Sequence, residues 1–379
     1  VVIKGTSAER KLLISESEKA DVVLTSYPLM RNDFLLYERN LYESVVLDEG
    51  QYIKSYSSLN AKSVKTLRAK SRFVLTGTPM ENALSELHSV FDFLMPGYLL
   101  SRNKFASVYE KPIISGDETS LRALREHIEV FMVRRLKHDV LKELPEKIEQ
   151  EIKIDLTLPQ KKIYAAHLLS VKSDIKQKLE EKGLQKSRFE ILSLLTRLRQ
   201  ICQDPSIFIE DYDGGSGKLD ALMDLLFDLI ESKRRALVFS SFTSVLGKIE
   251  ERLKAFGISY QYLDGKTEQD IRGERVEAFN RGEGEVFLIS LRAGGTGLNL
   301  FSADTVIHFD PWWNKAAMNQ ATDRAYRIGQ RQSVSVYSMI VADSIEERIF
   351  ELQNKKWSLA EQFIDGDGQA LKKLSVEEF

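Results

Sequence analysis

The sequence has one cysteine, Cys202, among its 379 residues. A single cysteine excludes a disulfide within the chain and favours a reducing compartment. No run of about 18 apolar residues occurs, so we expect no membrane-spanning helix. Positive charge is not in excess either, because 54 Lys and Arg face 56 Asp and Glu, which gives a net charge of −2. Any binding of nucleic acid must therefore come from local basic groups.

The sequence also lacks a phosphate-binding loop of the form G-x-x-x-x-G-K-[ST]. Gly217-Lys218 resembles half of such a loop, but Tyr212 stands where the first glycine is needed and Leu219 replaces the hydroxyl residue. No histidine is spaced with cysteine or another histidine for a shared metal, so we expect His88 to pack rather than to bind.

Length and composition predict an ordinary soluble protein of two or three domains. The chain is 43% hydrophobic and 29% charged, which gives it enough apolar residues for a sizeable core. In the first part, buried apolar runs at 21–27, 44–49 and 72–77 predict strands, and the stretches 28–39 and 57–69 predict helices. Apolar strands without alternation, separated by helices, indicate a parallel sheet covered on both faces.

A similar pattern restarts after a glycine-rich stretch at 213–217, which predicts a linker. Strands are expected at 236–242, 259–263, 286–291, 305–309 and 333–340, alternating with helices. Before the linker, residues 149–156 predict a half-buried strand and residues 160–209 a long helical region. The second part therefore predicts another doubly wound lobe.

Asp48 and Glu49 are the first candidates for chemistry, because they end a buried Val-Val-Leu strand. Ligands of parallel sheets lie beyond the carboxyl ends of the strands. In that position Asp48 could hold Mg²⁺ while Glu49 orients or deprotonates a water. The alternative is that Asp48 and Glu49 are a pair of solvated carboxylates in a loop.

A second candidate is the segment from Phe309 to Gln330. We expect one helix to carry Gln320, Arg324 and Arg327 on a single polar stripe. Two guanidinium groups one turn apart suit a triphosphate, because their planar forks match phosphate oxygens. Surface salt bridges are the alternative.

Three further stretches carry groups suited to phosphates. The turn 290–300 has three glycines whose backbone N–H groups can face oxyanions, with Arg292 beside them. Lys266 and Thr267 follow a strand and suit contact with a nucleic-acid backbone. Four cations lie within residues 134–138, where a phosphate contact and a solvated face fit equally well.

Taken in order, these segments resemble the motifs of Swi/Snf-type members of helicase superfamily two. Residues 48–51 resemble motif II, 75–82 motif III, 290–300 motif V and 320–330 motif VI, while 131–145 and 195–205 resemble two further family elements. The sequence departs from the family pattern at Gly50 for alanine, Asp204 for histidine, Lys315 for proline and Tyr326 for histidine.

The resemblance implies two RecA-like, doubly wound α/β lobes with helical insertions, the first lobe being incomplete. It implies ATP and Mg²⁺ at the cleft between the lobes, and double-stranded DNA along which the protein moves while it remodels or displaces bound protein. The expected catalytic residues are Glu49, Arg324 and Arg327, and the expected nucleotide-binding residues are Asp48, Gln51, Gly297 and Gln320, with Asp48 also holding Mg²⁺. The expected nucleic-acid contacts are Thr25, Ser26, Lys266, Thr267, Arg292, Gly295, Thr296 and Trp313.

The same resemblance predicts domain boundaries, and it predicts that activity requires sequence beyond these 379 residues. Residues 1–97 are expected to belong to lobe 1, 98–150 to a helical insertion and the return to lobe 1, 151–212 to a helical protrusion, 213–217 to the linker, 218–343 to lobe 2 and 344–379 to a C-terminal helix and tail. The phosphate-binding loop of the family normally precedes motif II, so we expect this chain to be a fragment that is not active alone. The expected location is the bacterial nucleoid or the eukaryotic nucleus, according to the source.

Two other functions remain open from the sequence. A strand-separating helicase of the same superfamily would share the lobes, but it would lack the helical block between motifs III and V. A non-catalytic module that only holds DNA or protein would follow if no phosphate-binding loop exists.

Overall fold

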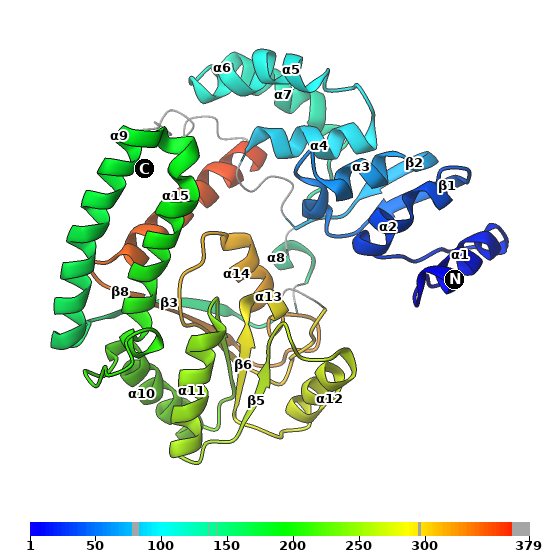
Figure 1. The fold of residues 1–379 in the computed structure, drawn as a ribbon. Helices are drawn as coiled ribbons and strands as arrows, with labels where there is room; N and C mark the ends of the chain where they lie inside the picture. The colour runs from blue at the N-terminus through cyan, green and yellow to red at the C-terminus, as the bar shows by residue number, and fades with distance from the viewer. Residues whose placement is uncertain (78–82, 136, 142, 295–296, 366–379) are drawn as a thin grey trace. The chain divides into compact units, whose positions relative to one another are not determined.

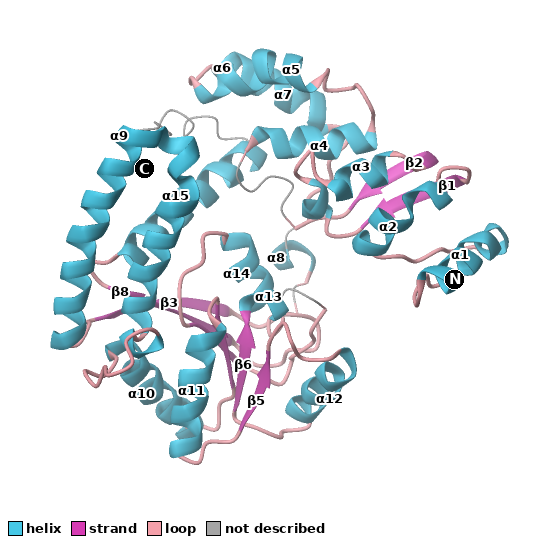
Figure 2. Ribbon diagram, in the orientation of Figure 1, coloured by secondary structure: helices cyan, strands magenta, loops and turns pink. Residues whose placement is uncertain are grey.

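The computed structural model describes residues 1–77, 83–135, 137–141, 143–294 and 297–365. The chain divides into two compact units, one formed by residues 1–134 with the described residues from 356 on, and the other by residues 135–355. Both units are α/β structures with parallel sheets, which confirms the expected fold class (Figure 1, Figure 2). Within the described residues, no helix is both long and apolar enough to cross a membrane.

The first unit contains a two-stranded sheet and its covering helices. Its elements are α1 (Ser7–Glu16), α2 (Tyr27–Tyr37), β1 (Leu41–Leu47), α3 (Leu59–Lys65), β2 (Arg68–Val74), α4 (Leu84–Leu94), α5 (Arg102–Phe105), α6 (Lys111–Ile114) and α7 (Glu118–Glu129). Short 3-10 helices at Ser17–Lys19 and Gly50–Ile53 and a π-helical turn at Ala106–Glu110 connect them.

The two strands of the first unit bury one face only. Leu47 and Val74 pack into a core with residues of α2, α3 and α4. On the opposite face Val46, Phe73 and Leu75 are each more than half exposed, at 55%, 52% and 55%. Parallel sheets are normally covered on both sides, so this face is unusual for its class.

Two sequence predictions in this unit were wrong. Residues 21–27 form no strand among the described residues: only Leu24 pairs, as an isolated parallel bridge with Val2, and Ser26 already caps α2. The helix expected over 57–69 ends at Lys65, and β2 begins at Arg68 because residues 68–71 pair with residues 41–44 of β1. Pairing with a distant strand, rather than the local apolar run, sets the start of β2.

The second unit is built around a six-stranded sheet. Its elements are α8 (Lys137–Val140), β3 (Lys147–Ile154), α9 (Leu158–Gln203), a 3-10 helix (Pro205–Ile207), α10 (Gly217–Glu231), β4 (Ala236–Ser240), α11 (Thr243–Ala255), β5 (Tyr260–Leu263), α12 (Gln269–Asn280), β6 (Val286–Ser290), α13 (Leu291–Gly294), β7 (Thr305–His308), α14 (Lys315–Thr322), β8 (Val334–Val341) and α15 (Ile345–Asp365). The strand order is β3-β8-β7-β4-β6-β5, with every pair parallel.

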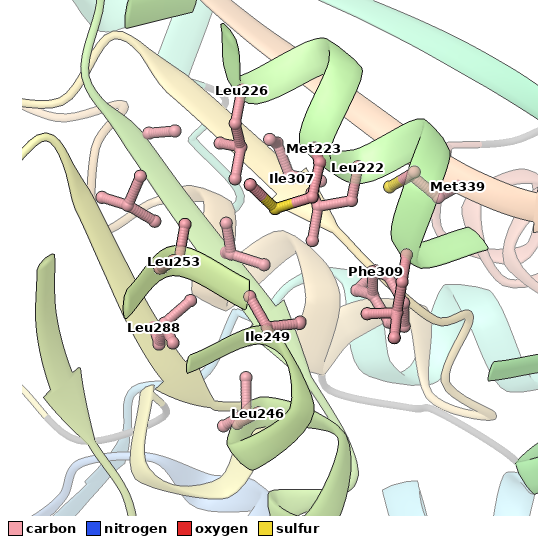
Figure 3. Packing of buried hydrophobic residues seen from close by; sticks show 14 of the residues in the cluster. Leu222, Met223, Leu226, Leu246, Ile249, Leu253, Leu288, Ile307, Phe309 and Met339 are labelled. Atoms are coloured by element: carbon pink, nitrogen blue, oxygen red, sulfur yellow. The ribbon is translucent and has the colours of Figure 1, made fainter. Parts of the chain in front are cut away.

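Both faces of this sheet are covered, so it is doubly wound. Leu288 and Ile307 point into one core, which apolar side chains of α10 and α11 close (Figure 3). Their neighbours in the strands point into the other core, with residues of α12, α13 and α14. The inner strands alternate between the two cores because successive side chains of a strand face opposite sides, whereas the edge strand β3 contributes only to the first core.

The five strands expected in the second half of the chain are confirmed, with ends shifted by up to two residues. The strand expected at 149–156 is also present as β3, and it pairs with β8 at the edge of this sheet. The second unit therefore includes sequence that precedes the glycine-rich stretch. The six domain ranges stay a prediction.

The glycine-rich stretch 213–217 packs against the second unit. Thr157 Oγ1 donates to the carbonyl of Gly214 at 2.9 Å, and Gly217 N–H donates to Gln160 Oε1 at 3.0 Å. A side chain at position 217 would collide with the carbonyl oxygen of Asp155. Glycine is needed at 217 for this close approach of two backbone segments.

Helix α9 doubles back on itself as two antiparallel arms (Figure 1). Gln160 Nε2 donates to the carbonyl of Ile201 at 3.1 Å, and Lys178 pairs with Glu190. A straight helix would separate Gln160 from Ile201 by about 60 Å at 1.5 Å per residue. The helical character expected for 160–209 is confirmed, and the hairpin was not foreseen.

Candidate nucleotide and nucleic-acid sites

The Asp48–Glu49 pair forms a turn at the carboxyl end of β1. Glu49 has a left-handed backbone, with φ 52° and ψ 57°, and its N–H donates to Asp48 Oδ1 at 2.9 Å. The carbonyl of Asp48 accepts a hydrogen bond from the Tyr27 hydroxyl at 2.8 Å. Burial raises the pKa of Tyr27, and the charges of Asp48 and Glu49 raise it further, so this hydroxyl stays a proton donor. A strained, hydrogen-bonded turn of this kind is typical of functional sites.

Gln51 connects this turn to the segment that follows β2. Its Nε2 donates to Glu49 Oε2 at 2.6 Å, and its Oε1 accepts from Thr76 Oγ1 at 3.1 Å. The carboxylate of Glu49 is therefore oriented by an amide that is itself fixed by the end of the neighbouring strand. The structure brings together these residues of two sequence motifs, while residues 78–82 of the second motif lie outside the described residues.

Gly50 makes the close approach between these two segments possible. Its N–H donates to the carbonyl of Leu75 at 2.9 Å, and a Cβ at position 50 would overlap Val74 Cγ1. The departure from the family alanine thus has a steric reason: Val74 fills the space that an alanine methyl would occupy.

The donor set at this turn suits Mg²⁺ bound together with a phosphate. In the part of the chain that the structure describes, no three His, Cys, Asp or Glu side chains are placed to hold a metal. Asp48 is an exposed single carboxylate. Mg²⁺ is commonly held by one or two carboxylates, substrate phosphates and waters, so Asp48 fits that role.

In the second unit, the glycine-rich turn follows β6 through the short helix α13. Arg292 is exposed, and Gly294 is buried where a Cβ would approach Phe239 Cε1 to 2.7 Å. Gly297 is exposed with φ 47°, a left-handed conformation that favours glycine. Gly295 and Thr296, both predicted nucleic-acid contacts, lie outside the described residues.

The arrangement predicted for the two arginines was wrong. Helix α14 ends at Thr322, so Gln320 lies on the helix, while Arg324 and Arg327 lie in the irregular segment Asp323–Gln330, which we call the arginine turn. Backbone hydrogen bonds within this turn span only two to four residues. The carbonyl of Arg324 accepts a hydrogen bond from Leu300 N–H, so it does not take part in a continued helix.

The arginine turn is tied to the glycine-rich turn by three hydrogen bonds. Arg324 Nε donates to the carbonyl of Gly294 at 2.9 Å, and Leu300 N–H donates to the carbonyl of Arg324 at 3.0 Å. Arg327 Nη1 donates to the carbonyl of Leu298 at 3.3 Å. These bonds orient both guanidinium groups relative to the glycine-rich turn.

Gln330 holds the end of the arginine turn and was not singled out from the sequence. Its Nε2 donates to the carbonyls of Phe301, Ala303 and Ala325 at 3.2, 2.7 and 3.3 Å. Its Oε1 accepts from the N–H groups of residues 331 and 332. One buried amide thus fixes three segments of backbone.

The residues predicted to bind nucleic acid lie in several separate places. Thr25 and Ser26 are exposed before α2 in the first unit. Lys266 and Thr267 lie in a turn closed by Asp264, whose Oδ1 accepts from Lys266 N at 2.9 Å and Thr267 Oγ1 at 3.2 Å. Trp313 is 37% exposed, in the connection between β7 and α14. Their shared role stays a prediction.

The region beyond the carboxyl ends of β4 and β7 is filled by an arginine from α9. These strands carry helices to opposite faces of the sheet and connect to strands on opposite sides, which is where ligands commonly bind in such sheets. Here Arg199 Nη2 bonds to Asp310 Oδ2 at 2.9 Å, Ser241 Oγ at 3.0 Å and the Pro311 carbonyl at 2.9 Å. Arg199 therefore anchors this arm of α9 to the segments that follow β4 and β7.

A second buried ion pair explains the segment that resembled half of a phosphate-binding loop. Lys218 and Glu346 are both fully buried and bonded to each other. Burial raises the pKa of Glu346, and Lys218 opposes that shift. Cys202 is fully buried in a core cluster of this unit, and burial raises the pKa of its thiol. Lys218 has a structural partner and is not placed for phosphate.

Sequence reasoning missed Arg199, Lys218 and Gln330 as structural residues. Each is a polar residue near an apolar stripe or a motif, and from the sequence such a residue is expected on the surface. A buried polar side chain needs a partner, and that partner lies 111 residues away for Arg199 and 128 for Lys218.

Comparison with protein families shows what these motifs belong to. Residues 1–207 match the SNF2-related domain, and residues 217–329 match the helicase conserved C-terminal domain. The chain belongs to the SNF2-related family. The expected Swi/Snf-type relationship is therefore confirmed.

Several relatives in this family are similar along nearly the whole chain. An uncharacterized ATP-dependent helicase of Mycoplasma genitalium is 36% identical over 100% of this chain and 36% of its own length. The putative ATP-dependent helicase/translocase YwqA of Bacillus subtilis is 38% identical over 95% of this chain and 40% of its own length. A solved SWI2/SNF2 ATPase core of Sulfolobus solfataricus in complex with double-stranded DNA is 32% identical, with a TM-score of 0.49, and the match covers 100% of this chain and 79% of that one. The chain thus spans little more than a third of these two bacterial relatives.

Proposed function

We propose that this SNF2-related chain is part of an ATPase that moves along double-stranded DNA and remodels or displaces bound protein. The observation that carries the proposal is the hydrogen-bond chain from Glu49 through Gln51 to Thr76 at the carboxyl end of β1. It holds one carboxylate in a fixed orientation beside Asp48, as water activation next to a metal-bound phosphate requires.

Each residue set has a distinct role in this proposal. Asp48 would hold Mg²⁺, which supplies positive charge to the phosphates when bound. Glu49 would orient the attacking water and accept its proton, with Gln51 fixing the carboxylate. Arg324 and Arg327 would bind the same triphosphate and stabilise charge that develops on it. Gln320 and Gly297 would complete the nucleotide contacts.

The exposed apolar face of the β1–β2 sheet supports the proposal that further sequence completes the first lobe of this ATPase. Val46, Phe73 and Leu75 expose an apolar surface on a sheet of two strands. A two-stranded sheet is marginal without further cover, and the 379 residues contain no phosphate-binding loop. We therefore propose that the cover and the loop come from sequence outside this chain, and that the chain alone does not hydrolyse ATP.

The proposed substrate is double-stranded DNA. The candidate contacts are Thr25, Ser26, Lys266, Thr267, Arg292, Gly295, Thr296 and Trp313, whose hydroxyl, cationic and aromatic groups suit a phosphate backbone. A protein that acts on DNA in this way would be located in the bacterial nucleoid or the eukaryotic nucleus.

The test measures ATP hydrolysis by the protein that contains this chain and by the 379 residues alone. Only the former should turn over ATP, with stimulation by double-stranded DNA. Glu49→Gln should lower kcat by about 10²-fold or more, as loss of a general base commonly does. Glu43→Gln is the matched control, because Glu43 lies on the same strand in an exposed pair with Lys70. Turnover by the 379 residues alone, or full activity of Glu49→Gln, would contradict the proposal.

Two DNA assays separate the alternatives. A translocase should displace the third strand of a triplex but leave a forked duplex paired, whereas a strand-separating helicase should unwind the fork. A binding module should retain DNA in both assays with no nucleotide turnover.

A further inference from the structure

Lys137 contacts the arginine turn at two points. Its Nζ lies 2.5 Å from Asp323 Oδ1 and donates to the carbonyl of Tyr326 at 3.2 Å. It also lies 5.7 Å from the centre of the Tyr326 ring. Asp323 directly precedes Arg324, and Tyr326 directly precedes Arg327. The ammonium group of Lys137 therefore contacts the residue before each of the two arginines.

Lys137 lies close to the point where the chain passes from the first unit to the second. The chain passes from the first unit to the second between Arg134 and Arg135, and Lys137 begins α8 two residues later. The segment that enters the second unit is therefore fastened to the arginine turn by side-chain and backbone contacts within that unit.

The arginine turn depends on such outside contacts for its shape. It is not part of a regular helix, and its backbone bonds span only two to four residues. Gln330 fixes its far end, while Lys137 fixes its beginning and middle. An ammonium group is suited to this, because its three donors can serve a carboxylate and a carbonyl at once.

We propose that Lys137 is a positioning residue that holds the arginine turn in the geometry needed to act on a triphosphate. The effect of Lys137 on catalysis rests on the proposed function, whereas its contacts with the arginine turn do not. Lys137 and Asp323 are 40% and 44% exposed, so their pair contributes little to overall stability. Its loss should loosen the turn without unfolding the unit.

The first test uses the 379-residue chain and needs no activity. Hydrogen exchange of peptides covering residues 323–330 is compared between wild type, Lys137→Ala and Lys137→Arg. Exchange in the turn should be at least several-fold faster in Lys137→Ala, and close to wild type in Lys137→Arg, which keeps the charge and the donors. Lys254→Ala is the matched control, because it breaks an exposed pair with Glu250 on α11. Unchanged exchange in Lys137→Ala would overturn the proposal.

The second test measures ATP hydrolysis by the longer protein that contains the chain. Lys137→Ala should lower kcat by about 10- to 100-fold with little change in KM, since displacing a catalytic group by about 1 Å can cost about 10²-fold. Lys137→Arg should restore most of it, and Lys254→Ala should match wild type. A kcat within twofold of wild type for Lys137→Ala would overturn the catalytic role. If the longer wild-type protein hydrolyses no ATP, the proposed function is contradicted. The hydrogen-exchange result then still decides whether Lys137 positions the arginine turn.

Discussion

At the scale of single residues, close contacts decide what a position tolerates. Gly50 differs from the family alanine, and its backbone is not in the left-handed region. The constraint is the neighbouring Val74, whose Cγ1 occupies the place of a Cβ. The glycine and the valine are therefore one packing unit, although 24 residues separate them in the sequence.

We expect Gly50→Ala to lower the stability of the first unit by about 1–3 kcal/mol, the usual cost of overpacking. Val74→Ala added to Gly50→Ala should recover part of the loss, because the methyl then has room. Chemical denaturation followed by hydrogen exchange in β1 and β2 measures both. Gly77→Ala is the control, since nothing lies within 4 Å of a Cβ there. Equal effects of Gly50→Ala with and without the valine change would contradict this account.

His308 predicts a pH dependence of the second unit. Burial lowers its pKa from 6.5 to about 4, while the charges of Asp310 and Glu149 oppose that shift. The unfolded chain therefore binds a proton between pH 6.5 and 4 that the folded unit does not. The stability linked to His308 is complete above pH 6.5 and is lost as the pH falls toward 4.

Unfolding of the second unit should therefore become easier over this pH range, by about 3 kcal/mol at most, at about 1.4 kcal/mol per pKa unit. His308→Gln, which can keep a hydrogen bond to Thr322, removes the titrating group. Denaturant titrations at several pH values should show a flatter dependence for this variant. Identical slopes for wild type and variant would show that other groups carry the effect.

At the scale of elements, buried charges join segments that the sequence keeps far apart. Arg199 fastens the returning arm of α9 to the ends of β4 and β7, and Lys218 fastens the start of α10 to α15. Arg199 also lies over the rings of Phe242 and Trp312, at 4.8 and 5.5 Å from their centres. Removing one partner of such a pair leaves a buried charge uncompensated.

Arg199→Leu should lower the stability of the second unit by about 3–5 kcal/mol, because Asp310 would remain buried without its cation. Asp310→Asn combined with Arg199→Leu should cost less than the sum of the two single changes. Arg197→Leu is the matched control, two residues away on the exposed side of the same arm. Urea denaturation measures all four proteins. A small effect of Arg199→Leu would show that Ser240 and Ser241 satisfy Asp310 without the arginine.

At the scale of the whole molecule, the two units differ in how completely they are built. The second unit has six parallel strands with cores on both faces. The first has two strands, one open face and a separate helical cluster built on α4, α5 and α7. Less buried apolar area per strand means less stabilisation.

Two unfolding transitions should follow, with the first unit melting at the lower temperature. Calorimetry combined with hydrogen exchange at residues of β1 and β4 assigns each transition to a unit. Gly50→Ala should shift only the lower transition and Arg199→Leu only the upper one. One coincident transition for both strands would mean that the units unfold together.

The sequence determined a good part of this protein because its signals are local. Apolar runs with breaks between them predicted the five strands 236–340, and short motifs predicted the family and the Asp48–Glu49 turn. Such features depend on residues within one element, so they can be read in order along the chain. The roles of those site residues remain proposals.

Tertiary structure alone decided the rest, because it depends on partners distant in sequence. The arginine turn is held outside helix α14 by bonds to Gly294, Leu298 and Leu300. Among the described residues, the segment 21–27 pairs only through the isolated bridge between Leu24 and Val2. The hairpin of α9 and the buried arginine at its base likewise follow from contacts between segments. Hydrogen bonds and ion pairs between distant residues leave no periodic pattern in a sequence, and only the folded chain shows them.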